Sequence, residues 1–217
     1  FYRPSSADAG DEIYTLVKMD AEQGEVQETT GFAGTGSNTV IYMSENSFYI
    51  TYLTTKTESE VTLNYLKDEG EQYLDQETVE RIEEIDSYDI SDESKYIELQ
   101  RALRDYRGTL KDEEAKEFSK NIQNGLNNYT EERKRELTTT GIAEFTRDLE
   151  LEAEGSVPGE VNDQFSISQK NGDLRIATTV GNSWTFNVES ENDLYVLDEE
   201  LERKGQIQGL GLTEEIY

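Results

Sequence analysis

The residues of this chain that could do chemistry are almost all carboxylates. The 217 residues include 48 Asp and Glu against 20 Lys and Arg, with no cysteine and no histidine. Thiol nucleophiles, Ser-His-Asp triads, disulfides and zinc sites that need sulfur or imidazole are therefore excluded. Any reaction would have to use carboxylates, hydroxyls, lysine or arginine, as in acid–base catalysis or glycoside cleavage by paired acids.

No single motif raises one carboxylate pair above the others, because 48 acids produce many pairs by chance. Asp193 and Asp198 flank a predicted strand, and we expect both at its solvated ends. Residues 34–38 are rich in glycine but lack the spacing and the lysine of a phosphate loop. Residues 156–159 are expected to form a turn, and no Gly-x-Ser-x-Gly nucleophile elbow occurs. The sequence therefore predicts no catalytic residue, no cofactor and no metal site.

Two aromatic residues form the candidate binding surface. Trp184 is the only tryptophan of the chain, and Phe186 lies in the same short segment. Exposed tryptophan often anchors a ligand or a protein partner. The competing interpretation is that both side chains pack in a core, and the sequence favours that interpretation.

The acid excess gives a formal net charge of −28 and has three possible meanings. Disorder is disfavoured by the 13 Tyr, 7 Phe and patterned aliphatic residues. Specific cation binding is disfavoured because no calcium loop occurs. Acids scattered over every segment favour a solvated shell adapted to strong salt, which screens the self-repulsion. The same charge argues against nucleic acid and against an anionic membrane surface as partners.

Three zones follow one another along the chain. Residues 11–58 read as short strands rich in Tyr, Ile, Val and Thr, with a loop at residues 31–37. Residues 59–137 carry apolar residues at helical spacing and predict three or four helices in a hairpin or bundle, with Ser91 as one N-cap. Residues 138–217 return to strands, and Asn171-Gly172 is the strongest hairpin signal. No apolar run approaches the 18 residues of a membrane span.

An internal repeat links the two strand zones. Residues 12–27 align without gaps onto residues 193–208, so that Tyr14 falls on Tyr195 and Gly24 on Gly205. A looser copy runs from Ile142 to Ile167. Four strands in a unit of about fifty residues are typical of a β-propeller blade. The sequence thus predicts a mainly β fold: two to three four-stranded antiparallel blades of a partial propeller, interrupted by a helical insertion.

Several segments carry a resemblance to a known family. The chain resembles secreted proteins of archaea and bacteria with a C-terminal β-propeller domain, distant relatives of WD-type propellers. The strand zones carry this resemblance in residues 157–166 (VPGEVNDQFS), 171–179 (NGDLRIATT), 192–198 (NDLYVLD) and 209–217, and the helical zone in residues 87–91 (SYDIS) and 98–100 (ELQ). The resemblance implies secretion or surface display, the acidity is similar to that of an extremely halophilic branch, and no catalytic residues come with it.

The expected function is non-catalytic: a secreted or cell-surface propeller piece that binds or scaffolds an unknown protein or glycan in high salt. Two alternatives stay open. One is a carboxylate-based glycosidase or metal-dependent hydrolase on a full propeller, and the other is a purely structural surface protein. Because two to three blades are too few to close a ring, we expect the chain to be a fragment of a longer protein.

Overall fold

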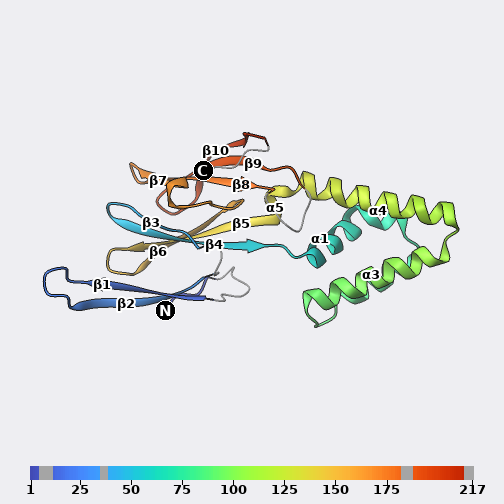
Figure 1. Cartoon of the computed structure of the whole chain (residues 1–217), viewed down its shortest axis with the longest axis horizontal. Helices are drawn as coiled ribbons and strands as arrows, with labels where there is room; N and C mark the ends of the chain where they lie inside the picture. The colour runs from blue at the N-terminus through green and yellow to red at the C-terminus, as the bar shows by residue number, and fades with distance from the viewer. Residues whose placement is uncertain (5–11, 35–38, 182–187, 213–217) are drawn as a thin grey trace. The chain divides into compact units, whose positions relative to one another are not determined.

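The computed structural model describes residues 1–4, 12–34, 39–181 and 188–212, which fall into two compact units (Figure 1). The sheet unit holds the described residues up to Thr55, those from Thr138 to residue 181, and those from Glu189 onward. The helical unit holds Lys56–Leu137 together with Val188. The protein is therefore mainly β, with a separate body of helices.

The strands of the sheet unit form three open antiparallel sheets, one with two strands and two with four. In each four-stranded sheet the strands lie side by side in sequence order. The strands are β1 (Glu12–Met19), β2 (Val26–Gly34), β3 (Ile41–Met43), β4 (Ser47–Thr55), β5 (Thr138–Thr146), β6 (Leu151–Pro158), β7 (Ile167–Lys170), β8 (Asp173–Val180), β9 (Glu191–Leu197) and β10 (Arg203–Leu210).

The middle sheet, β3 to β6, is covered on both faces. Successive side chains of a strand point to opposite sides. Phe48 and Ile50 of β4 accordingly share one core with Phe32 of β2, whereas Tyr49 belongs to a second core with Ile176 of β8. A strand buried on both faces needs apolar residues at successive positions, which is the pattern of β4.

The C-terminal sheet, β7 to β10, begins with the predicted hairpin. Asn171 and Gly172 have φ angles of 57° and 85°, the left-handed conformation at both central positions of a type I′ turn. Ile167 and Ile176 are then directly opposite each other on β7 and β8, and both are buried. The hairpin prediction is confirmed.

The helical unit has its own apolar core, formed by residues such as Tyr65, Ile85, Leu99 and Phe118. Ser91 caps the long helix α3 by accepting a hydrogen bond from the Ser94 amide, as predicted. The α-helices are α1 (Glu58–Tyr65), α2 (Gln76–Asp86), α3 (Asp92–Thr109), α4 (Asp112–Glu132) and α5 (Lys134–Leu137), and a π turn (Leu66–Gly70) and a 3₁₀ turn (Glu71–Tyr73) follow α1. Among the described residues, no helix combines the length and the apolar character that crossing a membrane requires.

The helical unit is inserted between two neighbouring strands of one sheet. Thr55 at the end of β4 is the register partner of Thr138 at the start of β5. The Lys56 amide donates to the Leu137 carbonyl over 2.8 Å, which continues the strand ladder by one bond. The β4–β5 pairing is therefore regular up to the residues where the insertion begins and ends.

The predicted repeat alignment is confirmed for the first strand of the unit and is wrong for the second. Tyr14 and Tyr195 occupy equivalent positions in β1 and β9, each of which is followed by an antiparallel partner. However, Tyr14 lies opposite Phe32, whereas Tyr195 lies opposite Gln206. The gap-free alignment would place Glu25 opposite Tyr14. The ungapped match fails because the first hairpin extends for more residues before its strands turn.

Three local predictions are corrected. Residues 31–34, predicted as part of a loop, complete β2, because Phe32 fills a core and Tyr2 adds a parallel bridge beside it. Residues 35–38 lie outside the described residues. Residues 156–158, predicted as a turn, end β6, where Pro158 pairs with Thr139 at the sheet edge. Residues 164–166, predicted as strand, form a 3₁₀ turn that Asp163 caps.

Candidate functional site

The predicted binding residues cannot be placed. Trp184 and Phe186 both lie in residues 182–187, outside the described part of the chain. The structure therefore neither gathers them into a patch nor separates them.

The two predicted strand-end acids have different environments. Asp193 is 1% exposed, so the expectation of a solvated position is wrong for it. Its carboxylate accepts hydrogen bonds from the Tyr195 hydroxyl (2.7 Å) and from the Gly209 amide (3.0 Å). A bulge in β10 and a φ of 73° at Gly209 bring that amide to the carboxylate. The Asp193 carboxylate thus holds β10 to β9 through its hydrogen bonds.

Asp198 has a local role in the turn after β9. Its carboxylate accepts hydrogen bonds from the amides of Glu200 (3.1 Å) and Glu202 (2.8 Å). Short acidic side chains commonly satisfy turn amides in this way. Since Asp193 and Asp198 are both occupied by separate backbone contacts, the structure does not combine them into a catalytic pair.

A polar row crosses the middle sheet and faces the C-terminal sheet. Tyr42 of β3, Tyr49 of β4 and Glu144 of β5 are successive register partners, so their side chains project from the same face. The Tyr49 hydroxyl donates to Glu144 Oε1 over 2.8 Å. The two tyrosine rings stack with centroids 6.0 Å apart. A carboxylate is thereby buried to 6% exposure in a central strand.

Gln169 of β7 completes this row from the opposite sheet. Its side-chain Nε2 donates a hydrogen bond to the Tyr49 hydroxyl (2.8 Å), and its backbone N–H donates one to the Tyr42 hydroxyl (3.1 Å). Burial, followed by the bond to Glu144, raises the pKa of Tyr49 far above its usual range. The phenol therefore keeps its proton and donates a hydrogen bond to the carboxylate. The chain Gln169–Tyr49–Glu144 fixes the orientation of all three groups.

A polar pocket of about 730 Å³ opens beside this row, within the sheet unit. Three hairpin turns surround it: those between β3 and β4, between β7 and β8, and between β9 and β10. Its lining is Tyr42, Ser44, Glu45, Asn46, Ser47, Glu144, Thr146, Glu152, Gln169, Lys170, Asn171, Gly172 and Glu199. With four carboxylates and one ammonium, the lining is acidic and rich in hydrogen-bonding groups.

None of the residues described at this site was among the binding residues predicted from the sequence. Glu144 stands between the buried residues Ala143 and Phe145 in a strand, and a charge at such a position is unusual. That anomaly was the available signal. The partner was not accessible from the sequence alone, because pairing Glu144 with Tyr49 requires the register of two strands that the helical insertion separates.

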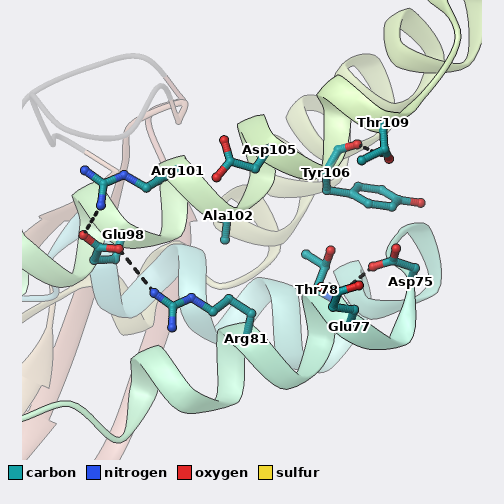
Figure 2. Close-up of a pocket in the computed structure, with 10 residues that line it drawn as sticks. All are labelled: Asp75, Glu77, Thr78, Arg81, Glu98, Arg101, Ala102, Asp105, Tyr106 and Thr109. Carbon is teal, nitrogen blue, oxygen red and sulfur yellow. Dashed lines mark hydrogen bonds and ion pairs between the residues drawn. The ribbon is translucent and has the colours of Figure 1, made fainter.

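A second pocket, in the helical unit, contains a row of paired charges that runs from Arg101 through Glu98 to Arg81 (Figure 2). Glu98 of α3 accepts a hydrogen bond from Arg101 over 2.7 Å and lies 3.5 Å from Arg81 of α2. Arg81 also donates to Glu84 and to the Tyr88 hydroxyl, both over 2.7 Å. The pocket holds about 290 Å³. Because its arginines are engaged by neighbouring acids, this cluster ties α2 to α3.

The chemistry that these sites offer is recognition by hydrogen bonds. Among the described residues, no group of three or more Asp or Glu side chains has a geometry that could hold a metal ion. The buried carboxylate Glu144 already accepts a hydrogen bond from Tyr49 on one oxygen. The pocket beside it presents carboxylate, amide and hydroxyl groups together with the half-buried Tyr42 ring.

Comparison with known proteins gives two relatives, both uncharacterised archaeal proteins. A protein of Archaeoglobus fulgidus is 39% identical over 216 residues, covering 100% of this chain and 34% of its own length. A protein of Methanocaldococcus jannaschii is 31% identical over 208 residues, covering 95% of this chain and 33% of its own. The chain thus spans about a third of the relatives that it matches. No solved structure matches the chain.

The family comparison covers nearly the whole chain. The family described as "Beta propeller domain" matches residues 2–217, including the helical insertion. Four-stranded antiparallel sheets that pack face to face are the units of a propeller. The match and the sheet topology agree, and the chain belongs to the β-propeller domain family.

Proposed function

We propose that this chain is a non-catalytic, ligand-binding part of a larger β-propeller displayed outside the cell in strong salt, and that the polar pocket beside Glu144 recognises a hydroxyl-rich ligand of the glycan class. The observation that carries the proposal is the prearranged row of Gln169, Tyr49 and Glu144 at the pocket wall. Such prearranged polar groups lower the entropic cost of binding.

The blade arrangement supports the propeller part of the proposal. We assign β3–β6 as a blade split by the helical insertion, β7–β10 as a full blade, and β1–β2 as half of a third. A closed ring needs at least four blades, so further strands must come from a longer protein. The relatives are about three times as long as this chain, which is long enough for the further blades.

The composition of the pocket lining supports the ligand class. Sugars offer many hydroxyl groups that both donate and accept, and carboxylates and amides satisfy them together. Glu152, Asn46 and Asn171 are exposed at the pocket, while Tyr42 supplies an aromatic ring for stacking. A protein partner would favour an apolar and aromatic patch instead. The acidic lining also disfavours an anionic ligand.

The test is binding of a panel of neutral oligosaccharides, measured by titration calorimetry at molar salt. Two variants are compared, whose substitutions lie two residues apart on β6. Glu152→Gln removes a pocket carboxylate, and we expect affinity to fall by about tenfold, or about 1.4 kcal/mol. Glu154→Gln makes the same change at another exposed position of β6, outside the pocket lining, and should leave affinity unchanged. Equal effects of both variants, or no binding to any member of the panel, would contradict the proposal.

The same protein, variants and oligosaccharides distinguish this proposal from the enzyme and structural alternatives. A glycosidase would release reducing ends from a bound oligosaccharide, and Glu152→Gln would abolish that release. A metal-dependent hydrolase would lose activity in a chelator. A purely structural surface protein would show neither binding nor turnover. We expect binding without turnover, with or without chelator.

The extracellular address has its own test. Whole cells carrying the full-length gene would be treated with a protease that cannot enter them, and the protein would be followed by immunoblot. Loss of the protein from intact cells, or its recovery in the medium, is the expected result. Protection in intact cells and cleavage only after lysis would contradict the proposed location.

A further inference from the structure

A groove in the helical unit remains unexplained by the proposed function. It runs between α3 and α4 above the end of α1 and has a volume of about 600 Å³. Small-molecule sites in proteins commonly have volumes of about 300–1,000 Å³. From Tyr96 to Arg107, its α3 wall extends about 16 Å at 1.5 Å per residue. The groove is therefore large enough for an extended small molecule.

The α4 wall of the groove is uncharged along its whole length. Its lining residues on this helix are Phe118, Ser119, Ile122, Gln123, Leu126, Asn127 and Thr130. These residues form one helix face, although 31% of the whole chain is charged. Phe118 is part of the helical core, and Ile122 and Leu126 are only partly covered by it. An apolar strip thus remains accessible beside polar amide groups.

The α3 wall carries two positive charges at one end of the groove. Arg104 and Arg107 are exposed and lie on the groove side of α3, three residues apart. No ion pair holds either guanidinium within the described part of the chain. In a chain with net charge −28, acids are available for pairing, as Glu98 shows for Arg81 and Arg101. The two unpaired guanidiniums make the end near Arg107 suited to an anion.

The floor of the groove contains a buried hydroxyl without a partner. Tyr65 at the end of α1 is 1% exposed, and its hydroxyl finds no hydrogen-bond partner among the described residues. Burial raises its pKa to about 12, so the hydroxyl stays protonated. An unsatisfied buried hydroxyl is destabilising, because it has given up its hydrogen bonds to water. The hydroxyl lies against Gly125 of α4, at the base of the groove wall, and a buried group of this kind calls for an explanation.

We propose that this groove binds a single-chain amphiphile, with its apolar tail along Ile122 and Leu126 and its anionic head group between Arg104 and Arg107. The apolar strip fits the tail, and the guanidinium pair gives the head a fixed end. A folded protein partner is less suited, because a stable protein interface buries about 800 Å² on each side. The site is independent of the polar pocket, so either proposal can fail without the other.

The probe is dansyl-labelled undecanoic acid, titrated below its micelle concentration into the full chain at molar salt and followed by dansyl fluorescence. We expect a dissociation constant in the micromolar range. The same label on an undecyl chain without a carboxylate should bind at least about tenfold more weakly, since it lacks the head group. Absence of saturable binding of the acid, or equal affinity for both probes, would overturn the proposal.

Two matched pairs of variants locate the site. Gln123→Trp fills the groove from an exposed position and should abolish binding, whereas Asn124→Trp, at the neighbouring exposed position outside the lining, should not. Arg104→Gln with Arg107→Gln should weaken binding at least about tenfold. Lys116→Gln with Lys120→Gln makes the same change in net charge away from the groove lining and should change affinity less than about twofold.

Folding of each variant is checked by circular dichroism before titration. The substituted positions are exposed, so we expect all variants to fold. Equal losses in the groove variants and their controls would show that binding is non-specific and would overturn the proposal. Saturable binding of an acidic amphipathic peptide, with no binding of the amphiphile, would also overturn it and would assign the groove to a protein partner instead.

Discussion

The ring of Tyr65 occupies the space where a side chain at position 125 would begin. A β-carbon added to Gly125 would stand 2.7 Å from Cζ of the tyrosine and 2.9 Å from Cε2, both far inside van der Waals contact. Glycine in the middle of a helix usually weakens it by about 1 kcal/mol. Here the absent side chain allows α1 to pack directly on the backbone of α4.

Gly125→Ala is therefore expected to destabilise the protein by about 1–3 kcal/mol, because overpacking outweighs the gain in helix propensity. Gly108→Ala provides the control: nothing lies within 4 Å of its added β-carbon, and it should stabilise by about 0.5–1 kcal/mol. Thermal unfolding of both variants measures the difference. In a Tyr65→Leu background, Gly125→Ala should become neutral or stabilising, and an unchanged penalty there would disprove the steric explanation.

Removing the helical insertion should leave the sheet unit folded. Replacing residues 56–137 by Asn-Gly joins Thr55 to Thr138 through a two-residue turn, which fits residues that are already register partners. Val188 would lose its contact with the helical core, so a small loss of stability is expected. Far-ultraviolet circular dichroism should show loss of the helical signal with a cooperative thermal transition retained. A non-cooperative melt would show that the sheets depend on the insertion.

Salt should stabilise this protein strongly. At a net charge of −28, self-repulsion opposes folding when the Debye length is about 10 Å at 0.1 M salt. At molar salt that length falls to about 3 Å, and the repulsion is largely screened. We expect the melting temperature to rise by at least about 5 °C between these conditions. An osmolyte without charge, at matched osmolality, should give a smaller rise if screening is the cause.

Protonation of Glu160 should stabilise the protein as the pH falls into the mildly acidic range. Burial raises the pKa of Glu160 above 4.5, so the folded state binds its proton more tightly than the unfolded chain does. The ionised form therefore destabilises the fold above the folded-state pKa. This penalty disappears as the pH falls through that pKa toward 4.5.

Glu160→Gln should accordingly raise the melting temperature at pH 7 by about 1–3 °C and have little effect at pH 4. The matched control is Glu154→Gln, an exposed change of the same kind that should be nearly neutral at both values. A gain of the same size at pH 4 and pH 7 would show that ionisation of Glu160 is not the cause.

The sequence predicted what depends on neighbours along the chain. The Asn171-Gly172 turn follows from two residues that tolerate positive φ, and the Ser91 cap follows from a hydroxyl placed before a helical pattern. The change from strand to helical periodicity located the insertion for the same reason. These features are local, so a single sequence contains them.

The features that it missed depend on register. Burial of Asp193 requires a bulge in β10 that brings the Gly209 amide to it, and burial of Glu144 requires Tyr49 from across the insertion. Phe32 was placed in a loop because Gly31 and Gly34 lie close to it in sequence, but both glycines belong to a strand whose end packs against Tyr2. Cross-strand partners of this kind cannot be derived from spacing in one chain.

The position of the insertion also constrains how the chain folds. The strands β4 and β5 make one of the most extensive pairings of the sheet unit, yet about 80 residues separate Thr55 from Thr138. Closing so long a loop by chance is entropically unfavourable and slows folding. The contacts of the helices are local, and once the helical unit has folded, its two ends are held one hydrogen bond apart at Lys56 and Leu137. A folded insertion therefore acts as a short hairpin loop, and its early formation would speed the pairing of the two strands that it separates.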